Sequence, residues 1–371
     1  MRVQIYGICW IFLLLERMSL HTIIGAMSGT SMDGLDLVIC EIESFSTDNY
    51  SYKILNAKTF PYPASILKLL QQSKTLSAER LFELDKLLGK QFALCINTFL
   101  KDVNIAADSI DAIASHGHTI FHRPEAGYTV QIGCGITIAK ETGIQVINDF
   151  RQKDVISGGQ GAPLVPIGDT MLFKDRADAF LNIGGFTNIS IPAANTIAFD
   201  ISPGNLPLNL TALELGKPYD NGGEMARRGR LNDEILQELN ALPFYQQSAP
   251  KSLGTEWLEK DFLPILHKIE RPEDRLHTCS VHIAEQIIAI CSQFKVKRLF
   301  ITGGGAFNGF LMEQLENNGV ELVIPGSQEI NFKEALIFAF LGLRFLEGKY
   351  NCLASVTGAS SNVCGGTLHL P

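Results

Sequence analysis

The residues best suited to chemistry stand in a loop near the start of the chain. Residues 25–40, GAMSGTSMDGLDLVIC, place three glycines, three hydroxyl side chains and Asp33 between two apolar runs. Backbone N–H groups and hydroxyls at such a tip can converge on a phosphate, and a carboxylate can hold Mg²⁺ directly or through water. A tight turn without any ligand is the alternative for this loop taken alone.

Two later glycine motifs support a nucleotide site. Residues 179–193, AFLNIGGFTNISIPA, repeat the order strand, glycine pair, polar tip and strand, and residues 303–305 are three glycines between a strand and a helix. P-loop and Rossmann motifs follow a strand with a helix, and neither pattern is present. We expect phosphates between the two hairpin tips and the base on the glycine run. The residues expected to contact the nucleotide are Ser28, Gly29, Thr30, Ser31, Asp33, Gly184, Gly185, Gly303, Gly304, Gly305 and Asn308, with Asp33 also holding Mg²⁺.

The bulk composition limits the class of partner. The chain has 371 residues, which favours two domains, and 46% apolar and 19% charged residues, which is an ordinary globular balance. Its net charge of −8, without a basic stripe, argues against a nucleic-acid partner. Eight scattered cysteines without a C-x-x-C pair indicate reduced thiols in a cytoplasmic protein.

The N-terminal segment needs separate treatment. Residues 5–15 form an apolar run that loosely resembles a signal peptide, but Glu16 and Arg17 follow it and a second methionine stands at Met18. The run is shorter than the roughly 20 residues that a membrane span requires. We therefore expect residues 1–17 to be a dispensable extension, with a membrane-associated or export segment as the alternative, and we expect no membrane partner.

The coarse pattern predicts two α/β domains. Apolar spacing predicts strands, helices and loop-rich stretches in alternation. The predicted strands are 22–27, 35–42, 111–115, 144–147, 297–302 and 320–324; the predicted helices are 78–100, 277–294, one from about 308, and 334–346; the loop-rich stretches are 148–166 and 199–209. We expect an N-terminal domain over 18–147 and a C-terminal domain over 148–344, with 345–371 as a candidate to rejoin the first.

Several motifs, in this order, resemble the 1,6-anhydro-N-acetylmuramic acid kinases. They are MSGTSMDGLD, SHGHTIFHRP, NDFRQKDVISGGQGAPLVP, LNIGGFTNIS, FDISPGN, TGGGAFN and KEALIFAFL, which together extend over residues 24–359. The resemblance implies two actin-like (ribonuclease H-like) domains with ATP and substrate in an interdomain cleft. It also implies a homodimer and a reaction in which water opens the anhydro ring and ATP phosphorylates O6.

The resemblance also implies roles for individual residues. Asp200 matches the catalytic carboxylate, which would deprotonate the attacking water; capping of the turn that follows is the alternative. Arg151, Asp154 and Glu334 match sugar contacts. For Arg151 the alternative is a salt bridge between domains, and for Glu334 an acid at a helix N-terminus. The histidines of the SHGHT stretch flank a glycine at a strand end and are expected to shape the cleft without binding a metal.

The chain departs from the family pattern beside the sugar. Ile201 and Ser202 stand where the family has a small hydroxyl residue and a glycine, Asn209 where it has an aspartate, and His118 where it has a glutamine. A positive φ at Ser202 would be strained. The sequence thus predicts a cytoplasmic, ATP- and Mg²⁺-dependent anhydro-amino-sugar kinase. The alternatives are a kinase for another amino sugar and a nucleotide-binding module of the same fold.

Overall fold

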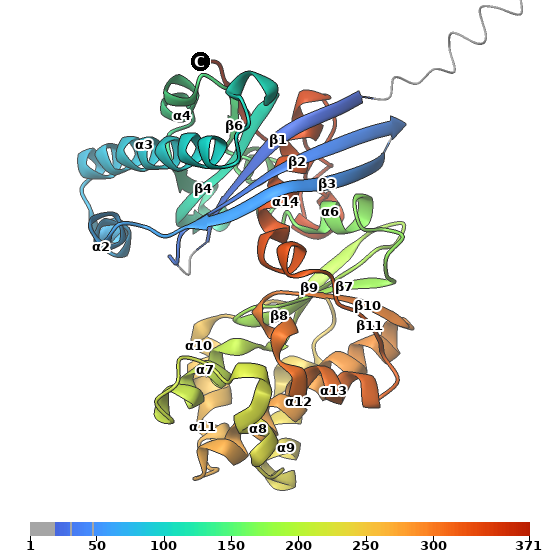
Figure 1. Ribbon diagram of the computed structural model, residues 1–371. Helices are drawn as coiled ribbons and strands as arrows, with labels where there is room; N and C mark the ends of the chain where they lie inside the picture. Colours follow the sequence, from blue (N-terminus) through green and yellow to red (C-terminus); the bar gives the residue numbers. More distant parts are fainter. Residues whose placement is uncertain (1–18, 30–31, 47) are drawn as a thin grey trace, which may run out of the picture. The chain divides into compact units, whose positions relative to one another are not determined.

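The computed structural model describes residues 19–29, 32–46 and 48–371 (Figure 1). Contacts divide the chain into two compact units: residues up to 172 together with 334–371, and residues 173–333. The expected extension, residues 1–17, lies outside the described residues. Within the described part, no helix is both long and apolar enough to cross a membrane.

The unit boundaries differ from the predicted ones at 147/148 and 344/345. Residues after 147 stay in the first unit because Asn148 still belongs to its sheet, where it pairs with Thr367 of the C-terminal strand. The helix α6 (Pro166–Met171) also packs there, since a Cβ on Gly168 would meet the Ile337 side chain at 2.6 Å. Local periodicity could not reveal these long-range contacts.

The sheet of the first unit has the order β12-β6-β4-β1-β2-β3, with β5 beside β4. β1 and β2 are antiparallel, as are β2 and β3, whereas β4 runs parallel to β1 and β6 parallel to β4. The strands are β1 (Ser19–Ser28), β2 (Leu35–Ser46), β3 (Asn49–Phe60), β4 (Ala112–Arg123), β5 (Tyr128–Ile132), β6 (Val146–Asn148) and β12 (Thr367–His369).

Helices cover both faces of this sheet. The predicted helix at 78–100 is present as α3 (Ala78–Asp102), whose leucines and phenylalanines pack with α4 (Gly135–Thr142) on the face that includes Ile24. The opposite face meets α14 (Ser327–Leu346), because a Cβ on Gly25 would collide with the backbone of Ala335. α14 begins seven residues before the predicted start at Glu334. Apolar residues on both faces explain why the strand sequences are nearly continuous hydrophobic runs.

The second unit repeats the same strand arrangement. Its order is β11-β10-β7-β8-β9, with β7, β8 and β9 antiparallel in turn and β7, β10 and β11 parallel. The strands are β7 (Ala179–Ile183), β8 (Phe186–Ile191), β9 (Ile197–Pro203), β10 (Arg298–Thr302) and β11 (Glu321–Val323). Two α/β sheets of one topology confirm the predicted fold of two actin-like domains.

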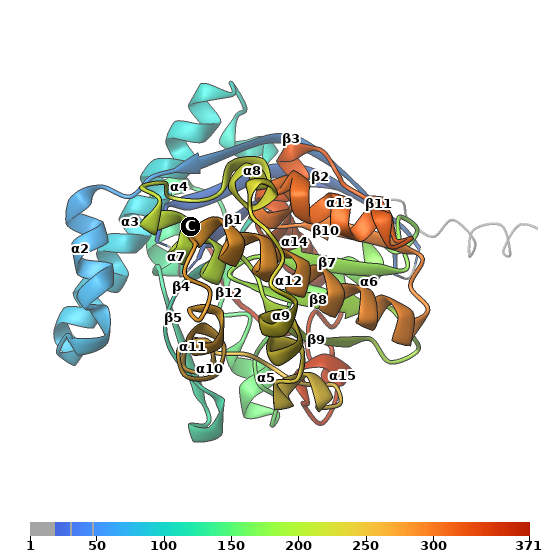
Figure 2. The ribbon, with the colours of Figure 1, turned by 90° about the horizontal axis from the view of Figure 1, so that it is seen from below.

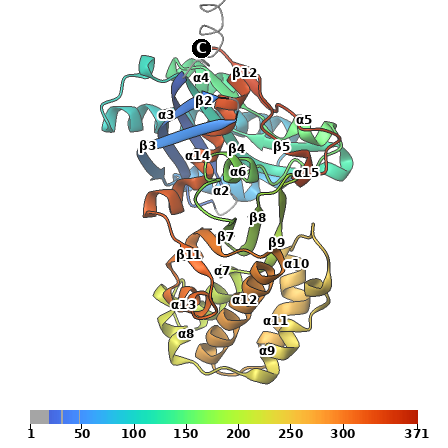
Figure 3. The ribbon, with the colours of Figure 1, turned by 90° about the vertical axis from the view of Figure 1, so that its right-hand side faces the viewer.

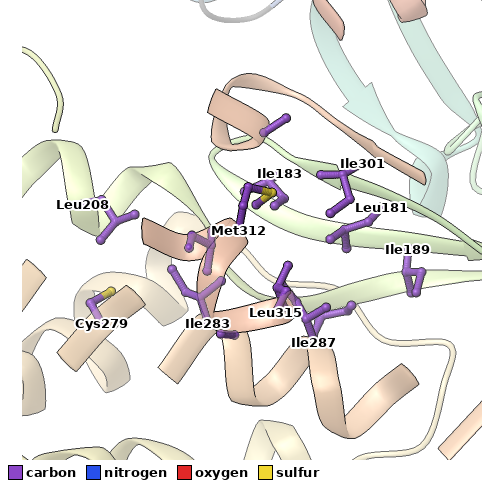
Figure 4. Packing of buried hydrophobic residues seen from close by; sticks show 14 of the residues in the cluster. Leu181, Ile183, Ile189, Leu208, Cys279, Ile283, Ile287, Ile301, Met312 and Leu315 are labelled. Atoms are coloured by element: carbon purple, nitrogen blue, oxygen red, sulfur yellow. The ribbon is translucent and has the colours of Figure 1, made fainter. Parts of the chain in front are cut away.

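A helical layer packs against one face of the second sheet. Figure 4 shows Leu181 and Ile301 from the sheet packed with Ile283 and Leu315 from the helices. Figures 2 and 3 show the helices on the same side of the strands of this unit. They include α7 (Asn205–Glu214), α8 (Glu224–Arg228), α9 (Asp233–Asn240), α12 (Pro272–Phe294) and α13 (Gly309–Asn317).

Candidate active site

The first hairpin has the predicted form. β1 ends at Ser28 and β2 begins at Leu35, so the tip is Gly29–Gly34, closed by a hydrogen bond from the Met32 N–H to the Gly29 carbonyl (3.3 Å). Asp33 is exposed at this tip. Thr30 and Ser31 lie outside the described residues, so their expected contacts with phosphate stay predictions.

The Ser28 side chain forms hydrogen bonds within the first unit. Ser28 is 1% exposed; the Tyr62 hydroxyl donates to its Oγ (2.5 Å), and Oγ lies 2.8 Å from His118 Nδ1. Because Tyr62 occupies an acceptor position, the Ser28 proton can point to Nδ1. Burial lowers the pKa of His118, which favours the neutral imidazole. The prediction that the Ser28 hydroxyl binds phosphate is therefore corrected: it joins β1 to β4.

The histidine pair lies inside a strand, contrary to the prediction of a strand end. β4 continues to Arg123, and Gly117 interrupts its alternation with φ 77°. His116 and His118 are 5% and 1% exposed. A Cβ at position 117 would lie 2.7 Å from the Ile132 carbonyl oxygen, so both the positive φ and the close approach require glycine. Within the described residues, no group of three or more His, Cys, Asp or Glu side chains could hold a metal.

Arg151 and Glu334 come together in the first unit. Arg151 Nε donates to His116 Nε2 (2.9 Å) and Nη1 donates to the Gly161 carbonyl (2.7 Å). Burial lowers the pKa of Arg151, and Glu334 is the strongest of the neighbouring groups that oppose this change. Glu334 is exposed and lies in the second turn of α14, so the expected alternative of an acid at the helix N-terminus is wrong.

Asp154 is placed differently from the prediction of a sugar contact. Its side chain is 0% exposed; Oδ1 accepts from Thr357 Oγ1 (2.7 Å) and Oδ2 from the Gly161 N–H (2.7 Å). Asp154 lies in α5 (Gln152–Ile156) and thus ties the following glycine loop to the C-terminal segment. A fully buried carboxylate with both oxygens bonded positions the loop and does not touch a sugar.

Asp36 is a functional candidate that the sequence interpretation missed. Burial raises its pKa to about 6, and the charges of Asp33 and Glu334 add to the increase, while a hydrogen bond from Thr59 opposes it. Three carboxyl groups of the first unit are therefore electrostatically coupled. The second aspartate of MDGLD was the available signal, since it stands three residues after Asp33.

In the second unit the two glycine motifs lie close together. The carbonyls of Gly184 and Gly185 accept from the N–H groups of Asn205 and Gly204 at the start of α7, each at 2.8 Å. A Cβ on Gly304 would lie 3.5 Å from Asn205 Nδ2. Asn205 therefore links the hairpin tip to the glycine run.

The glycine run itself is a close-packed turn. Gly303 has φ 82°, and a Cβ there would lie 2.6 Å from Asn182 Oδ1 and from the Ile183 carbonyl oxygen. The predicted helix start is confirmed: the Asn308 side chain accepts from the Leu311 N–H and caps α13. The amide oxygen of Asn308 is thus occupied by the helix.

A second glycine loop beside this turn was not predicted. Gly222 and Gly223 have φ 66° and 75°, and a Cβ on Gly223 would contact the Asn308 side chain. Asp220 fixes the loop by accepting from the N–H groups of Met225 and Ala226, both at 2.8 Å. The Asn-Gly-Gly sequence was a signal for it.

Asp200 lies on β9, in a stretch that the sequence interpretation wrongly expected to be loop. Its Oδ2 accepts from the Leu253 N–H (2.8 Å), and its own N–H donates to the Lys251 carbonyl (3.0 Å). The carboxylate is therefore held by a segment some 50 residues on, and it does not cap the following turn. Burial raises the pKa of Asp200, while the Leu253 bond opposes the rise. Among the described residues Oδ1 has no hydrogen-bond partner.

The departures beside Asp200 are accommodated without strain. Ile201 belongs to the hydrophobic core, and Ser202 is fully buried with its Oγ 2.8 Å from Thr187 Oγ1. Ser202 is absent from the residues with positive φ in the described part of the chain, so the expected strain there is not found. Asn209 lies on α7 and is half-buried.

Comparison with known proteins gives one consistent family. Residues 21–370 match the family described as anhydro-N-acetylmuramic acid kinase. A relative of that name from Francisella tularensis subsp. novicida (strain U112) is 35% identical over 374 residues, covering 93% of this chain and 98% of the relative. Another from Shewanella baltica (strain OS185) is 38% identical over 366 residues, covering 92% and 97%.

A solved structure similar to this chain is the activator of the 2-hydroxyisocaproyl-CoA dehydratase from Clostridium difficile with bound ADPNP. It is 12% identical, covers 90% of this chain and 97% of its own, and has a TM-score of 0.42.

Proposed function

Because the chain belongs to the anhydro-N-acetylmuramic acid kinase family, we propose that Asp200 activates the water that opens the anhydro ring while ATP phosphorylates O6. The enzyme is a phosphotransferase of cell-wall recycling, and its substrate is a small anhydro amino sugar. Its product is N-acetylmuramic acid 6-phosphate.

In the proposed reaction Asp200 accepts one proton, from the attacking water. The carboxylate takes a proton from water, the water oxygen bonds to C1, the C1–O6 bond breaks, and O6 takes the γ-phosphoryl group as ADP leaves. The observation that supports this role is that the two oxygens of Asp200 differ. Oδ2 accepts a hydrogen bond from the Leu253 N–H, whereas Oδ1 has no hydrogen-bond partner among the described residues. A base must be oriented and must reach the attacking water; Asp200 is fixed at Oδ2 and is only half-buried.

The sugar-binding residues are proposed in the first unit. Arg151 would pair with the lactyl carboxylate of the sugar, since a guanidinium matches a carboxylate in charge and shape. Glu334 would accept from ring hydroxyls, consistent with its exposure on α14. Asp154 acts through the loop that it holds, because its own side chain is fully buried.

The nucleotide contacts are proposed at the glycine motifs. Backbone N–H groups at Gly29 and at the pair Gly184 and Gly185 would bind phosphates, and the run Gly303–Gly305 would lie against the base. The exposed carboxylate of Asp33 fits an Mg²⁺ ion, which takes one or two carboxylates together with phosphate oxygens. When bound, the ion neutralises charge on the transferring phosphoryl group.

Product analysis tests the proposal. The purified chain is incubated with ATP, Mg²⁺ and the anhydro sugar, and the 6-phosphate with an open ring is measured by mass spectrometry. Asp200→Asn should bind ATP normally and lose at least about 10²-fold in turnover, whereas Asp233→Asn, an exposed carboxyl at the start of α9, should match the wild type. Wild-type turnover in Asp200→Asn would contradict the base assignment.

The same assay separates the rival functions. Phosphorylation with an intact anhydro ring would indicate a kinase for a different amino sugar, and ATP binding without any product would indicate a nucleotide-binding module. A homodimer and a cytoplasmic location remain predictions, which light scattering and cell fractionation would test.

A further inference from the structure

We propose that His116 is a positioning residue that aims the Arg151 guanidinium while leaving its positive charge uncancelled, so that the site selects anhydro sugars that carry a carboxylate. This inference rests on the proposed function, because it assigns a cause to the sugar preference of the same site. His116 does not itself touch the substrate; it acts through Arg151.

The hydrogen bonds of His116 define its protonation. Its Nδ1 lies 3.0 Å from the Gly117 carbonyl oxygen, which can only accept, so Nδ1 carries the proton. Its Nε2 receives the Nε–H of Arg151 at 2.9 Å and must be unprotonated. The imidazole is therefore the neutral Nδ1–H form. Burial holds the pKa of His116 well below its usual range, and the Arg151 charge lowers it further.

Packing keeps the imidazole in one orientation. The ring is 5% exposed and lies with its centroid 4.7 Å from that of Phe338, which in turn contacts Phe150 at 5.6 Å. The positive φ of Gly117 turns the strand at this point. The His116 imidazole is held at both nitrogens and at one ring face, so it has little freedom to move. It therefore fixes the position of the Arg151 guanidinium.

A second uncharged acceptor, a backbone carbonyl, also holds the Arg151 guanidinium. Arg151 Nη1 donates to the Gly161 carbonyl (2.7 Å), and the N–H of the same glycine is bonded to the buried Asp154. Among the described residues Nη2 has no hydrogen-bond partner. The strand β4, which carries His116, the helix α5, which carries Asp154, and the short helix α15 (Ala354–Thr357), whose Thr357 donates to Asp154, belong to the first unit (Figure 3).

The two acceptors of Arg151, the His116 imidazole and the Gly161 carbonyl, are uncharged, and this affects which sugar the site prefers. A carboxylate in the position of His116 would hold Arg151 equally well, but it would form an ion pair and cancel the charge that a substrate anion must meet. An imidazole and a carbonyl orient the group without that loss. The carboxylates that act on Arg151 are Glu334, which is exposed on α14, and, more weakly, Asp154, whose oxygens are bonded to Gly161 and Thr357. The arrangement thus favours an anionic ligand over a neutral one.

Two substitutions at the same position separate positioning from bulk structure. The glutamine side chain in His116→Gln can place its carbonyl oxygen near the position of Nε2 and still accept from Arg151, whereas the shorter asparagine in His116→Asn reaches only the position of Nδ1. The substrates are the anhydro-muramic sugar and its N-acetylglucosamine analogue, which lacks the lactyl carboxylate. The measured quantities are kcat and KM for each sugar, with KM for ATP as a check on folding.

His116→Asn should raise KM for the carboxylate sugar by about 10–100-fold and leave kcat/KM for the analogue unchanged. His116→Gln should stay within about threefold of the wild type, as should His267→Asn, a control at an exposed histidine of the second unit. In an Arg151→Ala background, His116→Asn should add nothing further, since the effect runs through Arg151.

Three outcomes overturn the inference. They are equal losses for both sugars, additive effects in the double variant, and a selectivity for the carboxylate that survives in His116→Asn. If that variant does not fold, Arg151→Lys keeps the charge without the Nε–H donor and must show the same loss of selectivity; retained selectivity refutes the inference. Failure of the proposed function is distinct, because the wild type would then form no open-ring 6-phosphate from the anhydro-muramic sugar.

Discussion

The raised pKa of Asp36 predicts a pH-dependent change in the stability of the first unit. Its pKa rises from the ordinary 3.8 to about 6, chiefly through burial and further through Asp33 and Glu334. The native state therefore binds this proton more tightly than the unfolded state does. By linkage, the stabilisation from the protonated carboxyl is complete below about pH 3.8 and is lost as pH rises through about 6.

The magnitude follows from the size of the pKa change. Each pKa unit corresponds to about 1.4 kcal/mol, so the change gives about 3 kcal/mol as an upper bound. Part of the carboxyl is open to water, and screening reduces the free energy of unfolding at stake to about 1–2 kcal/mol. In a domain of 150–250 residues, 1 kcal/mol shifts Tm by about 2–4 °C.

Asp36→Asn removes the charge and keeps an oxygen that can accept from Thr59, whose hydroxyl lies 2.5 Å from Oδ1. We expect this variant to raise Tm by about 2–8 °C at pH 7.5 and to lose most of that gain near pH 4. Differential scanning calorimetry of both proteins across this pH range measures the difference. Asp108→Asn, an exposed carboxyl in a short 3₁₀ turn, changes the net charge equally and serves as the control.

The pH dependence of the Tm change shows whether the charge of Asp36 is the cause. A Tm increase of the same size at pH 4 and 7.5 would mean that the substitution acts through packing or unfolded-state effects. An increase no larger than that of the control would mean that Asp36 is not strained. Either result would refute the account of three coupled carboxyl groups.

Three further outcomes follow from the same hydrogen bonds and burial. Thr357→Val removes the donor to Asp154 Oδ1 and should lower the free energy of unfolding by about 1–3 kcal/mol in urea denaturation, because a buried carboxylate oxygen is left unpaired. Ser202→Gly, which restores the residue of the family pattern, should lower stability by about 1 kcal/mol, because it breaks the bond to Thr187 and relieves no positive φ; a stabilised variant would contradict this. The acid limb of kcat/KM should lie above pH 3.8, since burial raises the pKa of Asp200 and the base acts only when deprotonated; a flat profile down to pH 4 would exclude this carboxyl as the base.

Local signals in the sequence predicted most of the elements. The hairpins and α3 follow from apolar spacing and turn glycines, and the helix after the glycine run begins at its Asn308 cap. The sequence predicts a loop around Asp200, where proline and glycine follow closely. In the structure those residues only end the strand, and its pairing with β8 is a long-range contact that periodicity does not encode.

The side-chain roles show the same limit. That Arg151 and Glu334 share one neighbourhood was predictable from the resemblance, and the structure brings them together electrostatically. That Asp154 and the Ser28 hydroxyl are buried was not predictable, because their partners Thr357 and His118 stand 203 and 90 residues away. Residue type indicates what a group can do, and tertiary contacts decide whether it faces a ligand.

The two units share one topology, and each has a left-handed glycine close to its hairpin tip. In the first unit β4 pairs with β1 up to Ser115 and again at His118, and Gly117 between them adopts φ 77°; in the second unit β10 pairs with β7 up to Thr302, and Gly303 then adopts φ 82°. Each unit thus has a left-handed glycine in the strand parallel to its hairpin, or directly after that strand. In the first unit this glycine is flanked by imidazoles that hold polar side chains, and in the second by further glycines that bring the backbone close. The same backbone conformation is therefore surrounded by side chains in the first unit and by close-packed backbone in the second.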